Sequence, residues 1–225
     1  MSAAGHEDGQ PDAIRFWEER YRAKGQIWSG QVNPVFARIV GSLPPGRALD
    51  LGCGEGADAV WLAERGWSVT AVDISPTALA RGAARAAELG VGERIAFAQH
   101  DLARSVPPGA WDLVSAQFLH SPLEFPKEQV LRAAAGRVAP GGLLLIVEHG
   151  AMPPWRRISA PGEHPGEDHH HPALFPTPQE LLDSLALDLR GWRVVELAAP
   201  SREAVGPDGQ RAELVDNVVA ICRDS

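Results

Sequence analysis

The sequence predicts a doubly wound α/β fold, with a mostly parallel sheet covered by helices on both faces. Short apolar segments that suit buried strands alternate with segments whose apolar spacing suits helices. The first strand segment runs directly into a glycine-rich turn, ALDLGCGEGA at 48–57, and a helical run follows at once. Such a turn leaves backbone N–H groups unpaired at the helix start, which suits a nucleotide or another cofactor.

Composition limits the classes of protein that fit this fold. A chain of 225 residues with 44% hydrophobic and 22% charged residues suits one globular domain. A net charge of −8 argues against nonspecific binding to nucleic acid. We find no signal peptide and no apolar run near the roughly 20 residues that span a bilayer. Two cysteines, Cys53 and Cys222, make no disulfide framework, so we expect a cytoplasmic protein.

Two helices are expected before the first strand, after a disordered leader at 1–12. They make a helical cap at 13–45 on a single domain at 13–225. The first helix is indicated by apolar residues at three- and four-residue spacing, namely Ile14, Trp17 and Tyr21. The second begins at Asn33-Pro34, a capping residue followed by proline.

The remaining elements follow the same alternation. The expected strands lie at 67–72, 94–98, 111–115, 143–147, 192–197 and 213–222. The expected helices lie at about 76–89, 127–138 and 177–187. About 15 residues, 198–212, join the last two strands, and no helix fits there, so we expect an antiparallel hairpin. A long irregular insertion at 151–176 is expected on the substrate side of the domain.

Polar residues stand where the parallel strands end. Ligands of such sheets bind beyond the carboxyl ends of the strands, where the strand order reverses. Asp73 ends the second strand 17 residues after Gly56, a spacing that suits a carboxylate binding a ribose diol. The other residues at strand ends are Asp50, Asp101, the segment Gln117–His120 and the pair Glu148-His149.

Two cofactors compete for the glycine turn. GCGEGA satisfies the dinucleotide fingerprint G-x-G-x-x-G/A, which would make the protein an NAD-dependent oxidoreductase. Asp50, two residues before the first glycine, would repel a pyrophosphate and would suit an ammonium group. The helices before the first strand and the terminal hairpin are also foreign to a dinucleotide sheet. A cofactor-binding protein without catalysis remains a further alternative.

The segments LDLGCGEG, AVDIS, QHDL, WDLVSAQFLH and the PGG-strand-EH run resemble successive motifs of the class I S-adenosylmethionine-dependent methyltransferases. The resemblance covers roughly residues 13–222. It implies a Rossmann-like sheet of seven strands in the order 3-2-1-4-5-7-6, with strand seven antiparallel. It also implies S-adenosylmethionine as the cofactor.

The resemblance assigns a role to each matching residue. Asp50 and the turn would hold the methionine part of the cofactor, the turn residues being Gly52, Cys53, Gly54 and Gly56. The ribose and adenine contacts would come from Asp73, Ile74, Asp101 and Leu102. Gln117 and Phe118 would line the methionine and the methyl-transfer face. For Ile74 and Leu102, ordinary core packing is the equal alternative.

The front end, FWEERY…IWSG, resembles the N-terminal segment of thiopurine, tellurite-resistance and halide methyltransferases. The resemblance implies that Trp28 closes over the cofactor, where an indole offers an N–H and a π face; a surface or core aromatic is the alternative. It favours a soft nucleophile as the methyl acceptor: a thiol, a chalcogen or a halide.

The acceptor decides how much catalytic help the reaction needs. Methyl transfer from a sulfonium is an in-line displacement, which needs alignment and exclusion of water. An oxygen or nitrogen acceptor would also need a general base, for which His120 and His149 are the candidates. His169 and His171, in the insertion, could ligate a metal, contact substrate or form a solvated turn. We expect a small-molecule acceptor, no nucleic acid and no membrane; a homodimer stays open.

Overall fold

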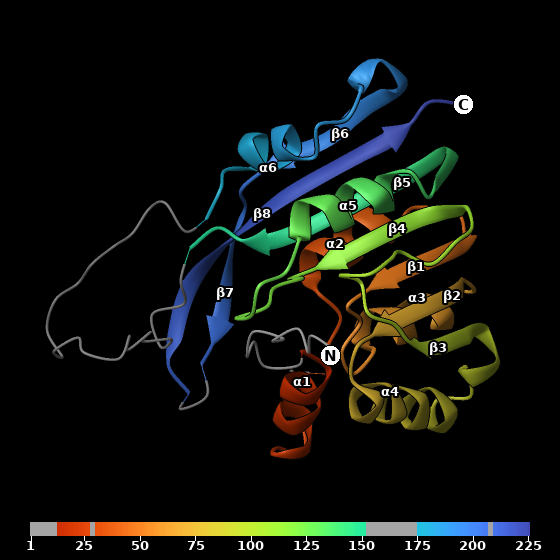
Figure 1. Ribbon diagram of the computed structural model, residues 1–225, viewed down its shortest axis with the longest axis vertical. Coiled ribbons are helices and arrows are strands. Elements are labelled where there is room, and N and C mark those ends of the chain that lie inside the picture. Colours follow the sequence, from red (N-terminus) through yellow and green to blue (C-terminus); the bar gives the residue numbers. More distant parts are fainter. Residues whose placement is uncertain (1–12, 28–29, 152–174, 207–208) are drawn as a thin grey trace, which may run out of the picture.

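The computed structural model describes residues 13–27, 30–151, 175–206 and 209–225, which form a single mixed sheet flanked by helices (Figure 1). The helices are α1 Ala13–Arg22, α2 Pro34–Val40, α3 Ala57–Glu64, α4 Pro76–Glu88, α5 Lys127–Ala135 and α6 Pro178–Ser184. The strands are β1 Arg47–Leu51, β2 Ser68–Asp73, β3 Ile95–Gln99, β4 Trp111–Gln117, β5 Val138–His149, β6 Trp192–Ala198, β7 Ser201–Val205 and β8 Arg211–Arg223.

The sheet order is β3-β2-β1-β4-β5-β8-β6. Strands β1 to β5 pair in parallel, and β8 is antiparallel to both β5 and β6. This confirms the expected order, with β8 in the place of the seventh strand. The order reverses between β1 and β4, and ligands of such sheets bind beyond the carboxyl ends of the strands at this point.

An eighth strand is the main departure from the expected sheet. We expected no helix in the connection at 198–212 and predicted no strand there, but Ser201–Val205 forms β7 and pairs antiparallel with the first half of β8. Because β8 is 13 residues long, its second half still pairs with β5 and β6. The β7–β8 ribbon extends beyond the carboxyl ends of the parallel strands, on the side where α1 also lies (Figure 1).

Two apolar cores fill the space between the sheet and its helices. One contains side chains of α5 and α6, such as Leu131 and Leu181, against β1, β4, β5 and β8. The other contains side chains of α2, α3 and α4, such as Phe36 and Leu62, against the opposite face. Strand β5 is therefore buried on both faces, as its continuous apolar run predicts.

Capping residues set the helix starts as expected. The Asn33 side chain accepts hydrogen bonds from the backbone N–H groups of Val35 and Phe36. Ser75 caps α4 in the same way, with a proline following it. The helix predicted over 127–138 is shorter, because residues 138–149 form β5 and Val138 pairs with Trp111 of β4.

The helix predicted over 177–187 also ends earlier, at Ser184. Leu185 is its C-cap, and Ala186 takes a positive φ of 48° that cannot continue an α-helix. Within the described residues, no helix is long and apolar enough to cross a membrane.

Candidate functional site

The glycine turn joins β1 to α3 at the point where the strand order reverses. Gly52, Gly54 and Gly56 have φ values of +67°, +54° and +77°, a backbone region in which residues with a Cβ are rare. A Cβ on Gly52 would stand 2.6 Å from Cδ1 of Leu119, which follows β4. The turn is thus shaped by glycine, and the segment after β4 lies directly beside it.

Three carboxyl groups gather beneath this turn. Asp50 is 2% exposed and accepts a hydrogen bond from the Ser115 hydroxyl at 3.3 Å. Asp73 is 7% exposed and accepts from the N–H groups of Gly54 and Ser75, both at 2.9 Å. Asp58, in the first turn of α3, accepts from the Asn33 N–H at 2.8 Å.

Burial raises the pKa of each of these acids. It raises the pKa of Asp50 to about 8, helped by the charges of Asp58 and Asp73 and opposed by the Ser115 hydrogen bond. Burial also raises the pKa of Asp58 to about 6 and that of Asp73 above its ordinary value. The pKa of the Cys53 thiol rises as well, because it is buried beside the same carboxylates. A cation placed here would let the acids ionise.

The predicted ribose and adenine contacts follow β2 and β3. Ile74 is half-buried, and its carbonyl accepts a hydrogen bond from the Gln99 amide. Asp101 is half-buried and caps the turn after β3 by accepting from the Ala103 N–H. Leu102 is 7% exposed and belongs to the core on the α5 side. The structure therefore places Leu102 chiefly in packing.

Gln117 stands out among the residues at the end of β4. Both atoms of its side-chain amide are buried, and neither has a hydrogen-bond partner among the residues that the structure describes. A buried amide without partners costs free energy, so it fits a site that a polar ligand completes. Phe118, the next residue, has a φ of +52°, a conformation rare for a bulky side chain.

Phe118, His120 and His149 form a row of stacked rings at the ends of β4 and β5. The centroids of Phe118 and His149 lie 4.4 Å apart, and those of His120 and His149 lie 5.6 Å apart. The guanidinium carbon of Arg202, on β7, lies 5.9 Å from the Phe118 centroid. The structure thus brings together both histidines that the sequence singled out.

Two buried ion pairs border this row. Arg202 pairs with Asp216, which is fully buried and stands opposite His149 in the β5–β8 ladder. Glu148 is 2% exposed and pairs with Lys127 at 2.8 Å. Burial raises the pKa of Glu148 against the opposing effect of Lys127, and its Oε1 has no described hydrogen-bond partner.

Three of the predicted site residues lie outside the part of the chain that the structure describes. Trp28, His169 and His171 are not among the described residues, nor is the leader at 1–12. Over the part of the chain that is described, no three histidine, cysteine or acidic side chains come together as a metal site would require.

Sequence reasoning missed Asp58, Arg202 and Asp216. A signal for Asp58 existed, since it lies two residues after the last glycine of the turn, in the first turn of a helix. Nothing local marked the other two, because their pairing depends on the unexpected strand β7.

Comparisons with known proteins agree with this geometry. Residues 48–142 match the model of a family described as a methyltransferase domain. Over 193 residues the chain is 32% identical to the 2-heptyl-1-hydroxyquinolin-4(1H)-one methyltransferase of Mycobacteroides abscessus, covering 81% of this chain and 74% of that protein. Over 101 residues it is 37% identical to a probable thiol methyltransferase of Arabidopsis thaliana, covering 44% of this chain and 45% of that protein.

A solved structure shows the same fold. The N-methyltransferase NodS of Bradyrhizobium japonicum, in complex with S-adenosyl-L-homocysteine, superposes with a TM-score of 0.62 at 17% identity, covering 95% of this chain and 100% of that one. The chain spans only 30% to 53% of the length of three of the curated relatives it matches. The matched methyltransferase domain, the alignment to the Mycobacteroides relative and the shared fold agree. The chain therefore belongs to the class I S-adenosylmethionine-dependent methyltransferases.

Proposed function

We propose that this protein transfers a methyl group from S-adenosylmethionine to a small-molecule acceptor. The observation that carries the proposal is the acid-lined cradle: Asp50, Asp58 and Asp73 are held beneath a glycine turn at the point where the strand order reverses. S-adenosylmethionine carries an ammonium group and a sulfonium, so its positive charges suit this cradle. A dinucleotide would place an anionic pyrophosphate against the same carboxyl groups, which argues against an NAD-dependent oxidoreductase.

The residues around the cradle would divide the binding of the cofactor among them. Asp50 would lie near the amino group, and the glycine turn (Gly52, Cys53, Gly54 and Gly56) would lie along the methionine part. The unpartnered amide of Gln117 would complete its hydrogen bonds there, since it is buried on the neighbouring strand. When bound, the cofactor supplies an electrophilic methyl group on sulfur.

The far side of the cofactor would be held at the ends of β2 and β3. Asp73 would accept from the ribose hydroxyls, Ile74 would pack on the adenine and Asp101 would accept from its amino group. Leu102 would add only its small exposed edge, because most of its side chain lies in the core. Trp28 remains proposed as an aromatic cover over the cofactor.

The methyl-transfer face would be the stacked row after β4 and β5. Phe118 offers an apolar surface that excludes water, and its unusual backbone is held by a 2.8 Å hydrogen bond from its N–H to the Val147 carbonyl. A soft nucleophile, such as a thiol, needs only alignment against this surface. The name of the Arabidopsis relative, a probable thiol methyltransferase, supports this acceptor class.

An oxygen or nitrogen acceptor is the second candidate. It is favoured by His120 and His149, whose rings lie together where the acceptor would approach. Either imidazole could accept the proton that a hydroxyl or amine must lose. The Mycobacteroides relative, named for a hydroxyquinolone, supports this second class and aligns over more of the chain.

The experiment is a screen of acceptors for S-adenosylhomocysteine release. The panel contains thiols, halides, tellurite, phenols, amines and small acids, each with and without S-adenosylmethionine. Turnover of thiols with inert phenols supports the first class, and the reverse result supports the second. A thermal shift with NAD but not with S-adenosylhomocysteine would contradict the proposal, and binding without any turnover would favour a non-catalytic protein.

A further inference from the structure

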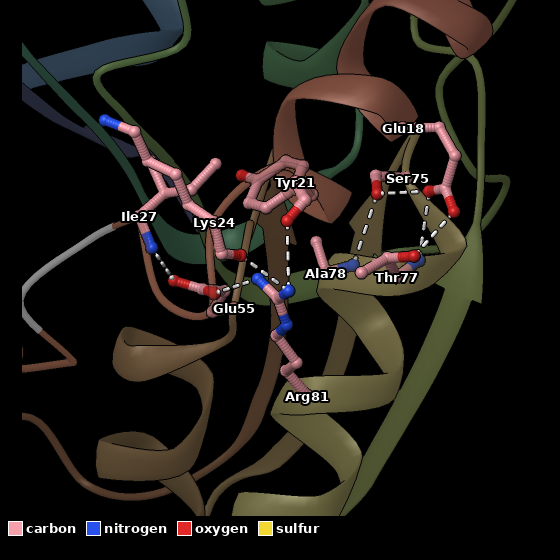
Figure 2. A network of polar contacts seen from close by, with 9 residues as sticks. All are labelled: Glu18, Tyr21, Lys24, Ile27, Glu55, Ser75, Thr77, Ala78 and Arg81. Atoms are coloured by element: carbon pink, nitrogen blue, oxygen red, sulfur yellow. Dashed lines mark hydrogen bonds and ion pairs between the residues drawn. The ribbon is translucent and has the colours of Figure 1, made fainter.

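Helix α1 is held to the domain by polar contacts more than by apolar ones. Its sequence predicts an apolar stripe, yet Ile14 is 39% exposed, and the buried residues of the helix are Glu18 and Tyr21. Glu18 accepts hydrogen bonds from the Ser75 hydroxyl at 2.7 Å and from the Thr77 hydroxyl at 2.5 Å. Figure 2 shows this carboxylate reaching the first turn of α4.

The charge state of Glu18 suits this contact. Burial alone would raise its pKa, but the hydrogen bonds from Ser75 and Thr77 and the charge of Arg22 outweigh burial and lower the pKa to about 2. The carboxylate is therefore ionised at all physiological pH values. The middle of the helix is therefore held to Ser75 and Thr77, just after Asp73.

Arg81 holds the C-terminal end of α1 and the residues that follow it. From α4 its guanidinium donates to the carbonyls of Tyr21 at 3.0 Å and Lys24 at 2.8 Å, and it pairs with Glu55 at 2.9 Å. The second oxygen of Glu55 accepts from the Ile27 N–H at 3.2 Å. As Figure 2 shows, Arg81 and Glu55 together hold the chain from residue 21 to residue 27.

Glu55 is the residue between Gly54 and Gly56 of the glycine turn. Its side chain is 10% exposed, and that of Arg81 is 29% exposed, so water screens the pair only in part. The same carboxylate thus belongs to the candidate cofactor loop and to the attachment of the N-terminal segment. A movement of the glycine turn would therefore alter the contacts that hold the N-terminal segment, and the reverse.

We infer that Arg81 is a positioning residue that couples the N-terminal segment 13–27 to the glycine turn, so that cofactor binding and the docking of this segment strengthen each other. The inference rests on the proposed function for the identity of the cofactor. By linkage, a ligand that fixes the glycine turn stabilises the docked segment by the same factor as the docked segment strengthens the ligand's binding. Arg81 touches neither the cofactor nor the acceptor in this scheme.

Limited proteolysis and calorimetry test the coupling on the full chain. Trypsin can cut after Arg20, Arg22 and Lys24, all within the segment. The test variants are Arg81→Met, which removes the donors, and Glu55→Gln, which removes the charge. The control is Arg85→Met, since Arg85 lies on the same helix and pairs on the surface with Glu88, three residues away.

We expect cleavage after residues 20–24 to be about tenfold faster in Arg81→Met than in Arg85→Met. S-adenosylhomocysteine binding to Arg81→Met should be weakened by about the factor by which S-adenosylhomocysteine slows cleavage of the wild type. Glu55→Gln should shift both quantities in the same direction. In the wild type, S-adenosylhomocysteine should protect these sites, and in Arg81→Met the protection should be largely lost. Unchanged thermal melting of the rest of the domain would show that Arg81→Met still folds.

Two results would overturn the inference. If Arg81→Met and Glu55→Gln bind S-adenosylhomocysteine as tightly as Arg85→Met, no coupling exists, although the proposed function stands. If S-adenosylhomocysteine binds the wild type but leaves its cleavage rate unchanged, the segment is not coupled to the cofactor. Failure of the wild type to bind S-adenosylhomocysteine at all would instead refute the proposed function, and the coupling with it.

Discussion

The proposed place of the Asp50 carboxyl beside the cofactor's ammonium group predicts a calculable pH dependence of cofactor binding. The pKa of Asp50 is about 8 in the protein without ligand, so at pH 7 about nine-tenths of the molecules carry it protonated. An ammonium group beside it favours the ionised form, so binding of S-adenosylhomocysteine must expel that proton. The affinity should therefore rise about eightfold between pH 6.5 and pH 7.5 and level off near pH 9.

Calorimetry in buffers of different ionisation enthalpy measures this proton directly. At pH 7 we expect release of close to one proton per S-adenosylhomocysteine bound. Asp50→Asn should abolish both the release and the pH slope, and should weaken binding at pH 8.5 by about tenfold or more, the value of a hydrogen bond to a charged group. Asp58→Asn is the matched control, because removing its charge lowers the pKa of Asp50 and moves the rise to lower pH without removing it. A flat affinity from pH 6.5 to 8.5, or a slope that survives in Asp50→Asn, would refute the reasoning.

Three further changes test the site. Gly52→Ala should lower the melting temperature and weaken S-adenosylhomocysteine binding, because its φ is +67° and a Cβ would meet Leu119 at 2.6 Å. Arg202→Met should lower the free energy of unfolding, measured by chemical denaturation, by about 3–5 kcal/mol, because it leaves the buried Asp216 unpaired. The double variant Arg202→Met/Asp216→Asn should recover most of this stability. Equal stability of the two variants would count against the pair. His149→Phe keeps a ring in the stack but removes the proton acceptor, so turnover of a thiol should survive it while turnover of a phenol should fall about 100-fold or more.

Local chain signals explain how much of the fold could be predicted. Asn33-Pro34 and Ser75-Pro76 mark helix starts through contacts within three residues, so they are visible in the sequence. Asp73 ends β2 as expected because valine and alanine dominate the strand before it and the capping serine follows it closely. The apolar runs of β4 and β5 likewise predict that His120 follows β4 and that His149 ends β5.

Contacts between distant residues explain what could not be predicted. β7 forms because its residues pair with residues 211–215 of β8, and its five residues alone carry no strong strand pattern. Arg81 stands in a helix rich in alanine and arginine, and the spacing of that helix gives no reason to prefer Arg81 over Arg85. Its pairing with Glu55, 26 positions earlier, is visible only once α3 and α4 lie side by side.

Three energetically unfavourable features lie together at the carboxyl ends of β1 and β4. The raised pKa of Asp50, the unpartnered amide of Gln117 and the positive φ of Phe118 each lower the stability of the folded chain. The two apolar cores on either face of the sheet supply the stability that tolerates them. In the proposed binding mode, Asp50 and Gln117 gain a favourable partner when a cationic, hydrogen-bonding ligand binds, whereas without a cation Asp50 stays largely protonated at pH 7. The proposed binding mode therefore predicts that the residues that make the domain less stable alone also favour a positively charged methyl donor.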